Sequence, residues 1–408
     1  MRLAACRRFL SVTATGILAV SMALSQFGSF SAASAASHGT NPVLIQGGGP
    51  DPARRLTVNP RAIHANFTGT HYLYVDDGGP GANGGPDSIE VFKITSAGAT
   101  HVQNFLTGAV QVSWFPGSNS LAYAKLYNCL ILTAWNGFME SFRVSPLTHL
   151  VTNAVSHIPD PNAGNPEDVH ISMLGTIAYM ADATARLSSW RIRVDCALTY
   201  LSTSTGGSGS EGYGNLALAG GTRLVSADTK NATIDTYALT TTGGITLLKK
   251  AASQVSRPEG ITVTGGKLFT GKGVTGPATA QGGKYSSGTG AITYFKGSPV
   301  SDPGGFEGIP VLFDATNHTL VEGNVVSSRL SNFSVSGTPT TMAFMSATSL
   351  AKSGFVDDLT QLQSTLFVNG VFSADIEACN LGTGGASSCA SFATLTKTGG
   401  LSNGLAVK

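Results

Sequence analysis

A short acidic motif recurs along the chain at a nearly constant spacing. It occurs as Pro166-Glu167-Asp168-Val169, Ser210-Glu211-Gly212-Tyr213, Pro258-Glu259-Gly260-Ile261 and Phe306-Glu307-Gly308-Ile309, with the Glu residues 44, 48 and 48 residues apart. The next step falls on Asp357, and the two preceding steps fall on Gln111 and Arg61. Hard cations such as Ca²⁺ bind six to eight oxygen ligands, many of them carboxylates. The spacing predicts a site for Ca²⁺ or another divalent cation, with Glu167, Glu211, Glu259, Glu307 and Asp357 as its ligands.

The same repetition has a structural interpretation. Several carboxylates crowded together repel one another, so some must be protonated, bind a cation or point away. A carboxylate at the same place in every repeat can instead accept backbone N–H bonds from the neighbouring repeat. Repetition favours this second interpretation, because each repeat needs the same joint whereas a binding site is needed once. Both interpretations remain open at this point.

The elements that must position these residues are short strands. Segments that run up to an aromatic or branched residue recur at 88–92, 138–142, 187–190, 233–237, 291–294, 330–333 and 372–376. Their last residues are 50, 48, 47, 57, 39 and 43 residues apart. A short apolar strand precedes each segment, another follows it, and Gly, Asn, Asp and Ser turns separate them. Beyond the N-terminal segment no helical periodicity is sustained, so the fold is predicted to be all-β.

Seven units of about four short strands predict a seven-bladed β-propeller of four-stranded antiparallel blades. A single blade cannot bury both of its faces, whereas blades arranged radially cover one another and leave only short edges. We expect the propeller to span residues 61–408, after a lead-in at 37–60. The last strand, 403–407, resembles a blade opening and is expected to close the ring by pairing with the first or the last blade.

Paired strands such as 72–75 and 88–92 resemble those of the seven-bladed propellers of the lactonase and YVTN-repeat type. This family includes 6-phosphogluconolactonases and muconate-lactonising enzymes. The resemblance covers residues 61–408 at the level of the blade pattern, and it implies the fold more strongly than a reaction. The tetrapeptide that names the YVTN repeats is absent from this chain.

In such a propeller the innermost strand of each blade would begin at one mouth of the central channel, where we expect the repeated acids to gather. Two irregular segments, 76–87 and 272–290, are expected to be loops on the same face. Arg61, His64 and Gln111 are predicted to bind a ligand there. His64 and His170 are both placed in innermost strands, where a lone His is more often a core residue than a catalyst. The alternative for His64 is an acid–base pair with a channel carboxylate for lactone hydrolysis. The predicted function is a ligand-binding or scaffold module, and the alternative is a lactonase-type hydrolase or cycloisomerase.

The N-terminal segment has the order of a secretory signal peptide. Arg2, Arg7 and Arg8 precede a mostly apolar run, and a small-residue stretch follows it at 31–36. The run is too short to span a membrane. We therefore predict that residues 1–36 are a signal peptide and that the mature protein is secreted or periplasmic, with no membrane span.

Charge excludes one class of partner. The formal net charge is +2. Removal of residues 1–36 takes away three Arg and no acidic residue, which leaves 22 basic against 23 acidic residues. A nucleic-acid-binding protein needs a concentrated positive field, which this sequence lacks. We expect no nucleic-acid partner, an extracellular or small-molecule ligand, and a monomer.

Four cysteines lie beyond the signal segment. Cys379 and Cys389 flank a glycine-rich stretch and are predicted to form a local disulfide. Cys129 and Cys196 are either a second disulfide or two buried thiols.

Overall fold

The computed structural model describes residues 65–78, 86–110, 118–134, 137–162, 166–182, 186–204, 216–273, 276–370, 373–396 and 401–408. The predicted signal peptide (1–36), the lead-in (37–60), Arg61, His64, Gln111 and Glu211 lie outside these ranges. Within them every regular element is a β-strand, and no helix is long and apolar enough to cross a membrane.

Seven antiparallel sheets confirm the predicted architecture. From the innermost strand outwards, blades 1 to 3 are β29 (Leu401–Val407), β1 (His71–Gly78), β2 (Pro86–Thr95), β3 (Gly98–Val110); β4 (Ser118–Ala124), β5 (Cys129–Ala134), β6 (Phe138–Val144), β7 (Val151–Pro159); and β8 (Pro166–Ile171), β9 (Ile177–Asp182), β10 (Leu187–Ile192), β11 (Leu198–Thr203). Blades 4 and 5 are β12 (Leu216–Leu218), β13 (Arg223–Asp228), β14 (Thr233–Leu239), β15 (Ile245–Ala252); and β16 (Pro258–Thr264), β17 (Lys267–Lys272), β18 (Pro277–Tyr285), β19 (Ile292–Tyr294) with β20 (Val300–Phe306). Blades 6 and 7 are β21 (Gly308–Asp314), β22 (Thr319–Asn324), β23 (Arg329–Ser336), β24 (Thr341–Ser349); and β25 (Val356–Leu362), β26 (Thr365–Gly370), β27 (Asp375–Gly382), β28 (Gly385–Thr394).

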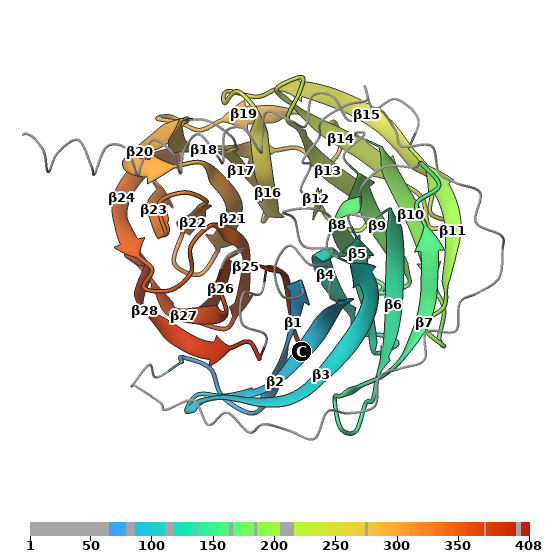
Figure 1. Cartoon of the computed structure of the whole chain (residues 1–408). Helices are drawn as coiled ribbons and strands as arrows, with labels where there is room; N and C mark the ends of the chain where they lie inside the picture. Colours follow the sequence, from blue (N-terminus) through green and yellow to red (C-terminus); the bar gives the residue numbers. More distant parts are fainter. Residues whose placement is uncertain are drawn as a thin grey trace, which may run out of the picture. The chain divides into compact units, whose positions relative to one another are not determined.

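The sheets are arranged radially, and the innermost strands surround the axis in the order β29, β4, β8, β12, β16, β21, β25 (Figure 1). Four of the second strands, β5, β9, β22 and β26, are buried along their whole length. Strands covered on both faces read as continuous apolar runs, which is why these segments show no alternation.

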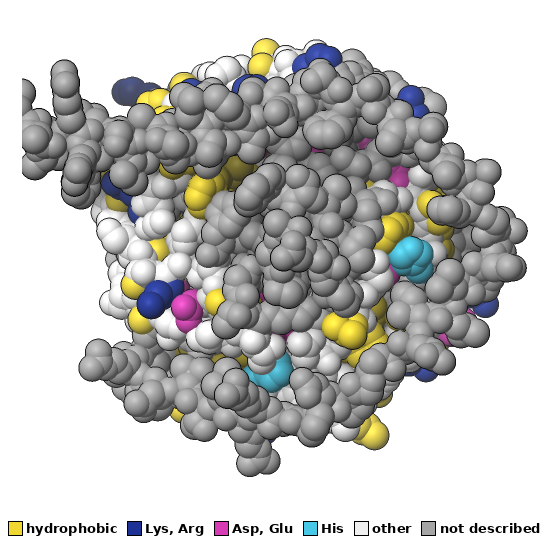
Figure 2. Space-filling model, in the orientation of Figure 1, with side chains coloured by type: hydrophobic (Ala, Val, Ile, Leu, Met, Phe, Trp, Pro, Cys, Tyr) yellow, Lys and Arg dark blue, Asp and Glu magenta, His cyan; other side chains and the backbone are white. Residues whose placement is uncertain are grey.

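On the described surface seen in Figure 2, hydrophobic side chains form separate patches among polar ones.

The core is divided into seven clusters, one between each pair of adjacent blades. In the cluster between blades 2 and 3, for example, Ile131 and Met139 pack with Met180 and Trp190. Because each cluster is shared by two blades, no blade is stable without its neighbours.

The C-terminal strand closes the ring by pairing with the first blade. β29 lies antiparallel to β1, with Leu73 opposite Val407, and the C-terminus lies beside β1 in Figure 1. Leu405 packs into the cluster between blades 7 and 1, and Ala406 into the cluster between blades 1 and 2. The innermost strand of this blade, which was predicted to begin at Arg61, is therefore β29; Arg61 and His64 themselves lie outside the described residues.

The third strand of blade 5 corrects the predicted repeat. Residues 291–294 belong to the outer strand β19, while β18 lies within the predicted loop 272–290. The third-strand residues that face equivalent positions of the second strands are Phe92, Phe142, Trp190, Tyr237, Gly283, Phe333 and Cys379. These residues are 46 to 50 residues apart, so the period is steadier than the sequence pattern suggested. Gly283 and Cys379 are not aromatic. The sequence pattern therefore placed the ends of these two third-strand segments at Tyr294 and Ile376 instead.

Two positions before each of these residues lies a buried polar side chain. The set is Glu90, Glu140, Ser188, Asp235, Gln281, Ser331 and Glu377. Four of its members accept backbone N–H bonds from the end of the preceding blade's outer strand or from the segment after it. The shortest of these bonds run from Thr396 to Glu90 (2.8 Å), Gly108 to Glu140 (2.9 Å), Gln254 to Gln281 (2.6 Å) and Lys352 to Glu377 (2.6 Å).

Two other joints use different chemistry. Between blades 5 and 6 the acid lies on the opposite side: Asp302 on β20 accepts bonds from Ser331 Oγ (2.7 Å) and Arg329 Nη2 (2.7 Å). Between blades 2 and 3 a disulfide joins Cys129 on β5 to Cys196 in the turn after β10. The predicted Cys379–Cys389 disulfide is confirmed and lies within blade 7. The structure also resolves the open alternative for Cys129 and Cys196 in favour of a disulfide.

Replacement of Glu377 by Gln tests the third-strand joint. Its carboxylate accepts N–H bonds from Ala351, Lys352 and Ser353, and an amide offers a single uncharged oxygen. We expect the free energy of unfolding in urea to fall by about 1–3 kcal/mol. Asp195→Asn, at an exposed turn, is the control and should change it by less than about 0.5 kcal/mol. An equally small change for Glu377→Gln would contradict the assigned role.

Removal of each disulfide by paired Cys→Ser substitutions tests the blade 2–3 joint. The Cys129–Cys196 bridge encloses a sequence separation of 67 residues and the Cys379–Cys389 bridge one of 10. Chain entropy predicts a loss of about 4 kcal/mol for the first and about 3 kcal/mol for the second. Guanidinium denaturation of both variants measures the two losses. A larger loss of stability on removal of the Cys379–Cys389 disulfide would contradict the role of the Cys129–Cys196 disulfide in joining blades 2 and 3.

Candidate functional site

Innermost strands begin, and second strands end, on one face of the propeller. The register shows this directly: Pro166 at the start of β8 lies opposite Asp182 at the end of β9, and Val356 lies opposite Gly370 in the same way. We call this side the loop face and the opposite side, where innermost strands end, the turn face.

The loop face carries every predicted metal ligand that the structure describes. Glu167, Glu259 and Asp357 are each the second residue of an innermost strand, and Glu307 immediately precedes β21. Glu167, Glu259 and Glu307 are buried, whereas Asp357 is half-buried. They do not form one group: Glu259 and Glu307 interact with each other, and Asp357 interacts with residues of blades 3 and 7.

Glu259 lies in a buried, crowded position between blades 5 and 6. A Cβ atom added to Gly273 would lie 1.9 Å from its carboxyl carbon, so only glycine leaves room for this side chain. Burial raises the pKa of Glu259 to about 8; Arg257 opposes this shift and Glu307 adds to it. The group is therefore largely protonated at neutral pH.

Glu322 at the end of β22 is a second buried acid of the same kind. A Cβ atom on Gly308 would lie 2.1 Å from its carboxyl carbon. Burial and the charge of Asp302 raise the pKa of Glu322 to about 8, although the backbone N–H of Lys272 opposes them. Blades 5 and 6 thus hold two acids that ionise only above the usual carboxyl range.

Blades 3 and 7 each anchor one carboxylate to neighbouring innermost strands. Asp168 accepts hydrogen bonds from the Leu216 backbone N–H (2.6 Å) and from Ser120 Oγ (3.1 Å), which joins β8 to β12 and β4. Asp358 accepts the backbone N–H of Leu405 at 2.8 Å, which joins β25 to β29. These bonds support the interpretation in which an acid of one repeat accepts a backbone N–H bond from the neighbouring repeat. The acids that do so are Asp168 and Asp358, the residues that follow Glu167 and Asp357.

These carboxylates and His170 form a group that we call the axial cluster: Asp168, His170, Asp357 and Asp358. His170 Nε2 lies 3.5 Å from Asp168 Oδ2. Asp358 acts electrostatically on His170, and Asp168 acts on Asp357. Because two innermost strands separate β8 from β25 on one side of the ring and three on the other, these interactions cross the axis.

The axial cluster combines a base and an acid. Burial lowers the pKa of His170, but Asp168 and Asp358 outweigh burial, so its pKa is raised. Burial and the two neighbouring carboxylates raise the pKa of Asp357 well above its usual value. The His170 side chain is 40% exposed. The cluster thus combines an accessible imidazole with a carboxyl group whose pKa is raised, which are the two kinds of group that general acid–base chemistry uses.

Sequence reasoning missed two of these four residues and gave a third no assigned role. The signal was present as doubled acids, Glu167-Asp168 and Asp357-Asp358, in which the second acid accepts the neighbouring backbone N–H group. The strand pairing shifts register at each of these pairs, as in a β-bulge. The first acid of the pair is the extra residue of the bulge, and it interrupts the alternation of side chains along the strand. Bulges of this kind cannot be read from a period of strands.

The predicted cation site is not tested by the structure. Within the described ranges no three His, Cys, Asp or Glu side chains are arranged as ligands of one metal ion. Glu211 lies outside those ranges, as do Arg61, His64 and Gln111. The five-carboxylate site and the three ligand-binding residues stay predictions.

Comparisons with known proteins bear on the fold. No protein-family model matches the sequence, and no curated protein matches it. Solved structures do: a protein from Lactobacillus plantarum (TM-score 0.63, 16% identity, 83% of this chain and 100% of that one), the periplasmic gluconolactonase of Pseudomonas aeruginosa (0.61, 13%, 83% and 99%) and a candidate 6-phosphogluconolactonase from Bacteroides uniformis (0.64, 11%, 83% and 99%). At these identities the likeness establishes that the chain has the fold of lactonase-type propellers.

The buried acids of blades 5 and 6 make stability depend on pH. The folded state binds protons on Glu259 and Glu322 more tightly than the unfolded chain does, since their pKa values rise from 4.5 to about 8. Their contribution is therefore fully present below the unfolded pKa and is lost as the pH rises through about 8. We expect the melting temperature to fall between pH 5 and pH 8.5.

The double variant Glu259→Gln/Glu322→Gln keeps the shape of the protonated acids and should flatten this dependence. It should melt at least about 2 °C above wild type at pH 8.5 and close to wild type at pH 5. Asp195→Asn should leave the slope unchanged. An unaltered slope in the double variant would show that other groups control the pH response.

Proposed function

We propose that the protein binds an uncharged, hydroxyl-rich ligand at the axial cluster. The observation that carries this proposal is that four half-buried titratable groups on the innermost strands of blades 3 and 7 interact across the axis. Binding sites in propellers and other closed folds favour such convergent polar groups. The proposal makes the protein a ligand-binding module.

The charge of the cluster selects the ligand class. The cluster contains three carboxyl groups and one imidazole, and the pKa of Asp168 is lowered by His170 and its hydrogen bonds despite burial, so this acid stays ionised. A phosphorylated or carboxylated ligand would meet like charge at close range. Sugar hydroxyls, in contrast, can donate to carboxylates and accept from a protonated carboxyl or imidazole.

A second candidate function, hydrolysis of an uncharged lactone, is supported by the presence of an imidazole and of a carboxyl with a raised pKa in the axial cluster, at His170 and Asp357, both of which interact with Asp168 and Asp358. Neutral His170 would remove a proton from the attacking water, and Asp357 would give its proton to the ring oxygen as the ester C–O bond breaks. The product is the open hydroxy acid, and the site is reset when His170 releases the proton that it took from water and Asp357 takes up a proton. The periplasmic gluconolactonase among the structural neighbours gives this candidate a precedent in the same fold.

The two disulfides are compatible with an extracellular or periplasmic location, where such bonds persist. We propose secretion on this ground together with the order of residues at the N-terminus.

The experiment measures binding and ring opening in parallel. The probes are glucono-δ-lactone, its 6-phosphate and a non-hydrolysable neutral pyranoside. Calorimetry reports binding, and a pH indicator reports hydrolysis. We expect wild type to bind the neutral pyranoside more tightly than any phosphorylated probe, and His170→Gln to weaken this binding about tenfold or more through loss of a charged hydrogen bond. His318→Asn, at an exposed turn, is the matched control.

Asp357→Asn distinguishes the two candidates. An amide resembles the protonated acid, so binding should survive in this variant, whereas it cannot donate a proton to a leaving group. A hydrolase would lose turnover without losing affinity, and a binding module would show no turnover in wild type. Preference for the phosphorylated probe, or equal binding by wild type and His170→Gln, would contradict the proposal.

A further inference from the structure

Five large apolar side chains are exposed together in turns of two adjacent blades. We call them the turn-face patch: Leu126 (55% exposed), Leu147 (88%), Met173 (72%), Leu174 (73%) and Val194 (73%). They lie in the β4–β5, β6–β7, β8–β9 and β10–β11 turns of blades 2 and 3, all on the turn face. The other exposed large apolar residues among those described lie on outer strands, as Leu248 does on β15.

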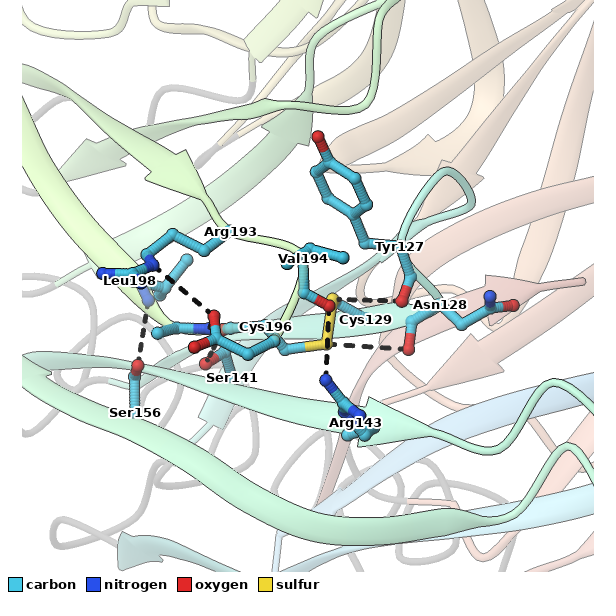
Figure 3. The surroundings of a disulfide bond; sticks show 12 residues. Tyr127, Asn128, Cys129, Ser141, Arg143, Ser156, Arg193, Val194, Cys196 and Leu198 are labelled. Atoms are coloured by element: carbon cyan, nitrogen blue, oxygen red, sulfur yellow. Dashed lines mark hydrogen bonds and ion pairs between the residues drawn. A yellow bond between two sulfur atoms is a disulfide. The ribbon is translucent and has the colours of Figure 1, made fainter.

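Contacts join three of the four turns, those that carry Leu126, Met173 with Leu174, and Val194. A Cβ atom on Gly175 would lie 2.8 Å from Leu126 Cβ, so the β4–β5 and β8–β9 turns touch. The Cys129–Cys196 disulfide ties the start of β5 to the turn that carries Val194 (Figure 3). Arg143 Nη2 donates to the Val194 carbonyl at 3.3 Å, which fixes the same turn from blade 2 (Figure 3). The apolar tips are therefore presented on a rigid base.

Basic residues surround the patch. Lys125, Arg143, Arg191 and Arg193 are all exposed and lie within or beside these turns. Asp195 is the one acid among the residues of the four turns, and it pairs with Arg193 at 3.6 Å. The buried Glu167, Glu259 and Glu307 lie on the loop face. The two faces of the propeller thus differ in charge, with the repeated acids on one side and a basic, apolar surface on the other.

We propose that the turn-face patch docks onto the surface of an anionic lipid bilayer. Clustered exposed apolar side chains mark interaction sites, because soluble proteins seldom leave them in water. Apolar tips flanked by Lys and Arg match the interfacial region of a bilayer, where apolar groups enter the acyl boundary and basic groups meet anionic headgroups. Charge complementarity favours this occupant over a neutral protein surface. Docking in this way leaves the loop face open to solvent.

Vesicle flotation tests the proposal on the full mature chain. Wild type should float with vesicles of phosphatidylcholine containing one third phosphatidylglycerol, and not with pure phosphatidylcholine. Met173→Ser/Leu174→Ser should weaken partitioning about tenfold or more, while Leu248→Ser should leave it unchanged. Lys125→Glu should weaken it about fivefold or more, and Lys352→Glu, an exposed lysine on the loop face, should not. Melting temperatures equal to wild type show that the variants fold.

Three outcomes would overturn the proposal. Wild type that floats with neither vesicle has no bilayer-docking surface. Flotation that Met173→Ser/Leu174→Ser leaves unchanged places binding elsewhere. Binding that high salt abolishes but that apolar substitutions do not affect would identify a general polyanion surface instead of a bilayer site.

Discussion

The structure depends on burial that is shared between blades. Each of the seven apolar clusters takes side chains from two sheets, so the ring must close before any blade is covered. β29 provides that closure by carrying Leu405 and Ala406 into the clusters on either side of blade 1. Buried acceptors such as Glu377 then fix the angle between blades, because backbone N–H groups of the neighbouring blade have no alternative partner once water is excluded.

The same constraint explains which features the sequence could predict. Strand number and all-β character follow from apolar runs and turn residues, and the disulfide of Cys379 with Cys389 follows from their local spacing. The third strand of blade 5 could not be placed by its aromatic residue, because Gly283 stands where five of the other blades have an aromatic ring. The position of His64 was predicted for an innermost strand that the C-terminus supplies instead.

The predicted metal ligands that the structure describes do lie on the loop face, and the proposed axial cluster adds residues that the repeat did not single out. A period of about 48 residues finds the beginning of each innermost strand, and Glu259 and Asp357 do lie there. The period carries no information on which blades face each other across the axis, and therefore could not pair Asp168 with Asp357. The repeat period also does not distinguish Glu322 from other strand residues, although burial raises the pKa of its carboxyl group to about 8. The interactions across the axis and the burial of Glu322 depend on three-dimensional proximity. The doubled acids depend on a one-residue β-bulge in each strand.

The central claim is that blades 3 and 7 bring His170 and Asp358 into electrostatic contact across the axis. The most direct test is the pKa of His170, measured by NMR on the imidazole of the folded protein in wild type and in Asp358→Asn. The structure predicts a wild-type pKa above 6.5 that falls when Asp358 loses its charge. A His170 pKa that Asp358→Asn leaves unchanged would contradict the proposed axial cluster.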